Sequence, residues 1–83
     1  MANGLKFDAM GVLHVADTSR GAIWKIVISG DGKGGKPTLL AQSPLLEGAD
    51  EMAFLGNGDL WVAANELNAI VSVTPAGEVK TII

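Results

Sequence analysis

The sequence predicts an all-β fold made of two four-stranded antiparallel sheets. Glycine accounts for 11 of the 83 residues. These glycines separate short runs rich in Val, Ile, Leu, Phe and Trp, a pattern typical of strands joined by turns. The chain also carries an internal repeat whose length suits one such sheet. Apart from residues 44–54, no window keeps a helical period for ten residues.

Eight strands are expected, near residues 4–8, 12–17, 22–28, 38–42, 51–55, 60–64, 69–74 and 78–82. Turn-forming Gly, Asn, Asp and Ser lie between most of them. One segment allows an alternative, because Ser43 could cap a helix that starts at Pro44 and runs to Phe54. Gly48 and the repeat argue against that helix, so a strand is favoured there.

The glycine-rich stretch 30–36 matches two phosphate-loop patterns, GxGxxG and GxxxxGK. Either pattern would need a helix to begin at this point. Lys36 is instead followed by Pro37 and by the strand-like residues 38–40. We therefore interpret the stretch as a flexible hairpin loop between the two outer strands of the first sheet.

Sliding residues 3–28 onto residues 50–75 reveals a repeat with an offset of 47. Identical residues include the pairs Phe7/Phe54, Gly11/Gly58, Leu13/Leu60, Val15/Val62, Ala16/Ala63, Ala22/Ala69 and Ile23/Ile70. A period of about 40–50 residues with four strands is the size of one β-propeller blade. Residues 1–83 are thus predicted to form one two-blade unit, with blade one at about 1–47 and blade two at about 48–83.

Residues 2–18 and 50–63 fit the patterns NGLxFxxxGxLxVAD and DxxxFxxxGxLWVA. In both segments the chain resembles the gluconolactonase/regucalcin-like propellers, which are related to NHL-repeat propellers. Members of that family close a ring of six blades within one chain. The resemblance therefore implies that this two-blade chain completes a six-bladed propeller as a homotrimer. Blade geometry alone leaves two alternatives open, a dimer with four blades and a tetramer with eight.

The strand patterns support such self-association. Residues 12–16 and 60–64 are nearly continuous apolar runs, whereas a strand with one wet face should alternate. Two isolated blades would expose apolar sheet faces, and another copy can bury them. The free face of blade one is the counterpart of the face that blade two presents, so the predicted contact is head-to-tail.

The resemblance also implies a metal site. In the lactonase branch a divalent cation lies at the mouth of the central channel, held by Glu, Asn and Asp. Asn3 and Asp50 match the Asn and Asp positions, and a hard cation such as Ca²⁺ suits their oxygens. Asp50 would also be the catalytic residue, assisting the attack of water on a metal-polarised sugar lactone. The alternative is that both are turn residues, and the family's Glu has no counterpart here.

The single histidine, His14, aligns with Trp61 in the repeat. That pairing favours a bulky group with a polar edge over a catalyst. Trp24, Trp61, Phe7 and Phe54 are expected to fill the gaps between adjacent blades.

Composition excludes several functions. The absence of cysteine removes disulfides, thiolate zinc sites and Cys nucleophiles. A net charge of −3 without a basic cluster argues against nucleic acid and anionic membranes as partners. Neither a signal peptide nor a membrane span is visible, so a cytoplasmic location is expected.

Two classes of function stay open. The favoured one is a self-assembling propeller module that binds a divalent cation at its central channel. The alternative is a metal-dependent lactonase acting on sugar lactones or related esters.

Overall fold

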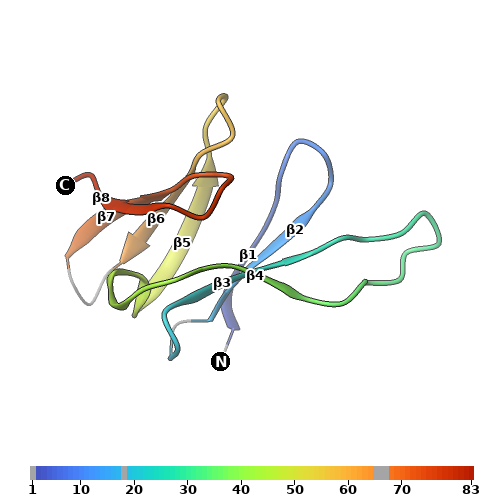
Figure 1. The fold of residues 1–83 in the computed structure, drawn as a ribbon, viewed down its shortest axis with the longest axis horizontal. Helices are drawn as coiled ribbons and strands as arrows, with labels where there is room; N and C mark the ends of the chain where they lie inside the picture. Colours follow the sequence, from blue (N-terminus) through green and yellow to red (C-terminus); the bar gives the residue numbers. More distant parts are fainter. Residues whose placement is uncertain (1, 18, 65–67) are drawn as a thin grey trace.

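The computed structural model describes residues 2–17, 19–64 and 68–83, with the backbone alone for Ala2, Asn3 and Asp50. It contains two four-stranded antiparallel sheets with strands in chain order (Figure 1). Sheet one holds β1 (Ala2–Phe7), β2 (Leu13–Asp17), β3 (Ala22–Ile26) and β4 (Thr38–Gln42). Sheet two holds β5 (Ala49–Phe54), β6 (Leu60–Ala64), β7 (Ala69–Val73) and β8 (Val79–Thr81). The predicted all-β class and the two sheets are confirmed.

The first strand of each sheet begins two residues earlier than predicted. In β1 the register shifts between Ala2 and Gly4, and in β5 it shifts between Ala49 and Glu51. An extra residue at such a β-bulge lets pairing continue beyond the interruption. Hydrophobic alternation does not reveal this extension, because a bulge breaks the two-residue period.

The segment between the sheets contains one short 3₁₀ turn, η1 (Pro44–Leu46), rather than the alternative helix. The Ser43 hydroxyl accepts a hydrogen bond from the Leu45 N–H at 3.1 Å, and Pro44 begins the turn. Ser43 and Pro44 therefore start a helical segment, but it lasts for only one turn. Gly48, with a φ of 75°, redirects the chain into β5.

The glycine-rich stretch forms part of a hairpin arm that leads from β3 to β4 and projects away from both sheets (Figure 1). The Ser29 N–H donates to the Lys33 carbonyl at 2.9 Å, and the Gly35 N–H donates to the Val27 carbonyl at 2.8 Å. Hydrogen bonds from the Ser29 hydroxyl and the Lys33 N–H hold the pKa of the Asp31 carboxyl below its ordinary value. Strand β4 follows Lys36, so the hairpin prediction is confirmed.

The two sheets pack against each other through one face each, with β1 and β5 side by side (Figure 1). Sheet one contributes the buried side chains of His14, Ala16, Ile23 and Ala41. Sheet two contributes Leu60, Val62, Val71 and Val73, and Leu46 from η1 completes the core. Strands β2 and β6 bury alternate residues, so the other face of each sheet stays uncovered along these strands within the chain.

Candidate functional site

Asn3 and Asp50 occupy equivalent backbone positions in the two sheets. The ladder pairs Ala2 and Gly4 with residues of β2 and skips Asn3. In β5 it pairs Ala49 and Glu51 with residues of β6 and skips Asp50. Bulges of this kind often re-aim a side chain next to an active site. Strands β1 and β5 contact each other, and each bulge lies near the start of its strand.

The side chains of Asn3 and Asp50 lie outside the described part of the structure. Among the side chains that are described, no group of three or more His, Asp or Glu could hold a metal ion. Glu47 and Glu51, which flank Asp50, are exposed. The cation at Asn3 and Asp50 and the catalytic role of Asp50 therefore stay predictions.

Sheet one leaves an apolar face uncovered. Cross-strand pairing places on this face the side chains of Leu5, Phe7, Leu13, Val15, Trp24, Ile26 and Leu39, which we call the open face of sheet one. Phe7 is 58% exposed and Leu5 is 65% exposed. A hollow of about 460 Å³ lies over Val15, Trp24 and Ile26, with Pro37 at its edge. The sequence predicted such a face, but not the part that β4 adds to it.

Sheet two is uncovered on its opposite side. As the ladder pairing shows, its open face consists of Glu51, Ala53, Trp61, Ala63 and Ile70, with Ser72 on the same side but buried at 4% exposure. Trp61 is 36% exposed and is the largest side chain of this face. A smaller hollow of about 210 Å³ lies against it.

The repeat relates these open faces to the contact between the sheets. His14 and Ile23 lie on the covered face of sheet one, and their counterparts Trp61 and Ile70 lie on the open face of sheet two. Phe54 pairs with Leu60 on the covered face of sheet two, and its counterpart Phe7 lies on the open face of sheet one. The chain therefore carries one completed sheet contact and an unpaired copy of each of its halves.

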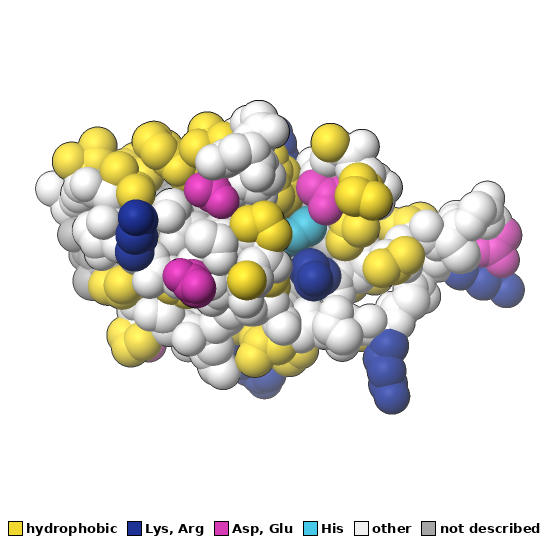
Figure 2. All heavy atoms as spheres, turned by 45° about the horizontal axis from the view of Figure 1, so that its top comes forward, with side chains coloured by type: hydrophobic (Ala, Val, Ile, Leu, Met, Phe, Trp, Pro, Cys, Tyr) yellow, Lys and Arg dark blue, Asp and Glu magenta, His cyan; other side chains and the backbone are white. Residues whose placement is uncertain are grey.

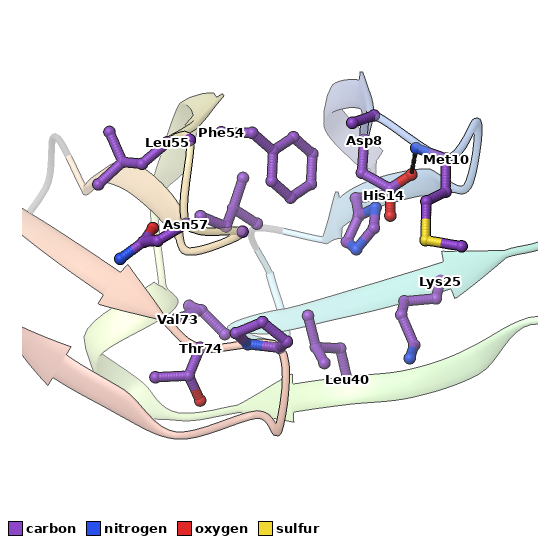
Figure 3. Close-up of a pocket in the computed structure, with 15 residues that line it drawn as sticks. Asp8, Met10, His14, Lys25, Leu40, Phe54, Leu55, Asn57, Val73 and Thr74 are labelled. Atoms are coloured by element: carbon purple, nitrogen blue, oxygen red, sulfur yellow. Dashed lines mark hydrogen bonds between the residues drawn. The ribbon is translucent and has the colours of Figure 1, made fainter.

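A pocket of about 440 Å³ lies between the sheets, bordered by the turns that follow β1, β5 and β7. Figure 2 shows the histidine at the bottom of this hollow, among hydrophobic side chains and with an acidic and a basic group beside it. In Figure 3, His14 and Lys25 extend from sheet one, and the Phe54 ring of sheet two lies opposite His14. The pocket lies at the ends of β1 and β5, whereas Asn3 and Asp50 lie near their starts.

His14 is 4% exposed, and its ring meets Phe54 edge-on with centroids 4.8 Å apart. The prediction of a bulky group with a polar edge describes this packing. Of the four aromatic residues expected between blades, Phe54 alone meets that expectation within the chain. Phe7, Trp24 and Trp61 lie on the open faces, because the pleat directs them away from the contact between the sheets. The sequence pattern did not identify Lys25 as a pocket residue. The one signal that could have found it is that its repeat counterpart, Ser72, carries no charge.

No helix in the described part of the chain is long and apolar enough to cross a membrane. Comparison with known protein families finds no match to this sequence. Comparison with curated proteins finds none either.

Proposed function

We propose that this chain is a self-assembling β-propeller module of gluconolactonase/regucalcin-like ancestry, whose copies join head to tail into a six-bladed homotrimer. The observation that carries the proposal is the pair of open faces. Each is the repeat counterpart of a face already packed inside the chain. A surface that matches half of an existing contact is best covered by the other half, which a second copy supplies.

The internal contact gives the expected details of the contact between copies. Within the chain, His14 of sheet one meets Phe54 of sheet two. Moving this pair by one repeat places Trp61 of one copy against Phe7 of the next. Edge-to-face packing of two aromatic rings contributes about 0.5–1.5 kcal/mol beyond the area that is buried.

Magnitudes favour a closed ring over an open pair. Fully burying a large apolar side chain is worth about 1.5–3 kcal/mol. If a contact buries half of each of the seven side chains on the open face of sheet one, the gain in free energy is roughly 5–10 kcal/mol. Association costs about 4–15 kcal/mol in lost translation and rotation. A ring of three copies has three contacts but immobilises only two chains relative to the third, so closure adds a contact at little further cost.

The mass in solution tests the assembly. Light scattering should report about three times the chain mass of 8.5 kDa at micromolar concentration. Dilution should move the population directly from trimer to monomer, because an open dimer lacks the closing contact. A stable monomer, or a dimer that persists on dilution, would contradict the ring.

A divalent cation at the channel mouth is part of this proposal. The support is that Asn3 and Asp50 sit at matching bulges near the starts of adjacent inner strands. In a trimer, three copies of each would surround one axis, and oxygens are the ligands that Ca²⁺ prefers. Calcium should then raise the melting temperature of the chain, because a ligand bound only by the native state stabilises it. Asp50→Ala should abolish the rise, whereas Glu51→Gln, which neutralises the exposed neighbour, should keep it.

The same two bulges favour the alternative function, a metal-dependent lactonase in which Asp50 takes a proton from the attacking water. Hydrolysis of a sugar lactone should then require added metal and be lost in Asp50→Asn, which keeps the shape but removes the base. Glu51→Gln is the control and should keep the rate. Turnover that persists in a chelator would exclude this mechanism.

A further inference from the structure

Three nitrogen-bearing side chains form a row across sheet one, on the face that meets sheet two. The ladder pairs Lys6 with His14 and His14 with Lys25. The counterparts in sheet two are Ala53, Trp61 and Ser72, which form the same row without a charge. The row in sheet two lies on its open face, but the strands pair in the same way with Ala, Trp and Ser, so strand pairing does not require the two lysines and the histidine. Their presence in blade one calls for a separate explanation.

His14 places a polar atom in the pocket between the sheets. Its Nδ1 lies 3.2 Å from the Val12 carbonyl oxygen. A carbonyl can only accept, so Nδ1 is the donor and Nε2 of the neutral ring is an acceptor. Among the described residues Nε2 forms no hydrogen bond, although His14 as a whole is only 4% exposed. No buried side-chain nitrogen or oxygen of the described residues lacks a partner, so Nε2 is the part of the ring that is open to the pocket. A free acceptor at a pocket is suited to an O–H donor from a ligand.

Lys25 supplies an unneutralised charge at the same pocket. It is half-buried, and it forms no ion pair with any described residue. The other charged group of the pocket, Asp8, already accepts hydrogen bonds at one carboxylate oxygen from the N–H groups of Met10 and Val12, both at 2.9 Å. Those bonds hold the turn after β1 in place. They do not remove the negative charge of Asp8, but Lys25 is the one cationic side chain among the described residues that line the pocket, and it can therefore pair with an anionic ligand.

We propose that this pocket binds a small carboxylate with an apolar body and a hydroxyl group. The carboxylate pairs with Lys25, the hydroxyl donates to Nε2 of His14, and the body packs on Phe54, Leu60 and Val73. The volume of about 440 Å³ lies within the range of roughly 300–1,000 Å³ common for small-molecule pockets. The site lies within one chain, so it does not depend on the trimer or on a metal at Asn3 and Asp50.

The test uses 4-hydroxybenzoate as the probe and follows backbone amide shifts of the full chain by NMR. Saturable shifts are expected at Lys25, Phe54 and Leu55. Lys25→Met keeps the aliphatic stem but removes the charge, and should weaken binding about tenfold, the lower end of what a charged hydrogen bond contributes. Lys33→Met, on the hairpin arm outside the pocket, is the charge-matched control and should bind normally.

Two further comparisons test the hydrogen bond to His14 and the space in the pocket separately. Benzoate, which lacks the hydroxyl, should bind more weakly than 4-hydroxybenzoate, and His14→Phe should remove that difference. His14→Trp puts the residue of the second blade into the first and should fill the pocket and abolish binding while the amide spectrum stays dispersed. Shifts confined to the open faces, equal losses in Lys25→Met and Lys33→Met, or no binding at millimolar probe would overturn the proposal.

Discussion

Gly77 lies where the backbone of sheet two meets that of sheet one. Its φ is 91°, and a Cβ added there would overlap the carbonyl oxygen of Leu40 in β4. Gly11, in the turn after β1, has a similar φ of 83° but nothing within 4 Å of an added Cβ. Both glycines have a left-handed backbone, but only Gly77 has a close neighbour. Comparing an alanine substitution at each position therefore distinguishes the cost of backbone strain from that of steric overlap.

We expect Gly77→Ala to destabilise the chain more than Gly11→Ala. The left-handed conformation alone costs alanine about 1–2 kcal/mol, which both variants pay. Gly77→Ala adds an overlap with backbone, and overpacking of this kind costs about 1–3 kcal/mol more. Urea unfolding at one protein concentration measures both. Equal losses would mean that the sheets can separate locally to admit a methyl group.

Alignment of the two repeats already predicted the surroundings of His14. The His14/Trp61 pairing predicted a packed histidine with a polar edge, and the structure places the ring on Phe54. Sequence could not show that Lys25 borders the same pocket as Phe54, because these residues belong to different sheets and meet only through packing.

At the scale of elements, the η1 turn fixes the connection between the sheets. Besides capping the turn with its hydroxyl, Ser43 donates a backbone hydrogen bond from its N–H to the Gly21 carbonyl at 2.9 Å. The turn then inserts Leu46, which is fully buried, into the core that both sheets share. Because η1 contacts β6 and β8, Leu46 anchors the connection on sheet two.

Leu46→Ala should therefore cost about 2–5 kcal/mol, the range for a leucine truncated inside a core. Leu45→Ala is the matched control, because Leu45 lies in the same turn and is only half-buried. Thermal unfolding followed by circular dichroism compares the two variants. If both lose the same stability, the turn acts through its backbone and not through the buried side chain.

For the whole molecule, the two open faces lie on opposite sides and differ in shape. A head-to-tail contact uses one face of each kind, whereas a two-fold contact would use the same face twice. Charged substitutions can block one face at a time without touching the core. Trp24→Asp blocks the open face of sheet one, and Trp61→Asp blocks that of sheet two.

Each of these variants alone should be monomeric, because every head-to-tail contact needs one intact face of each kind. An equimolar mixture should form a heterodimer of about twice 8.5 kDa and nothing larger, since only one compatible pair of faces remains. Labelling one variant with ¹⁵N gives the two chains different masses, so native mass spectrometry of the mixture can distinguish heterodimers from dimers of a single variant. Dimers of a single variant would indicate a two-fold contact, and trimers in the mixture would show that the tryptophans are not part of the interface.

What the sequence determined by itself is local or repeated along the chain. Short apolar runs separated by turn residues predicted all eight strands, since both depend on neighbours in sequence. The offset of 47 predicted two similar sheets. Ser43 and Pro44 indicated a helix start only as the disfavoured alternative of a helix to Phe54, and the structure has a single 3₁₀ turn there. The glycine-rich stretch was correctly separated from phosphate loops because Pro37 and the following strand-like residues exclude a helix there.

Only the tertiary structure decided which face of each sheet is covered. Residues 12–16 and 60–64 are apolar on both sides, so their pattern is the same whichever side packs inward. Packing of sheet one on sheet two buries His14 and Ala16 in one sheet but Leu60 and Val62 in the other, although these are not repeat counterparts. Because the two sheets bury non-equivalent faces, each sheet leaves a different face open. The same packing creates the pocket around His14 and Lys25. These features depend on contacts between distant segments, which no local pattern encodes.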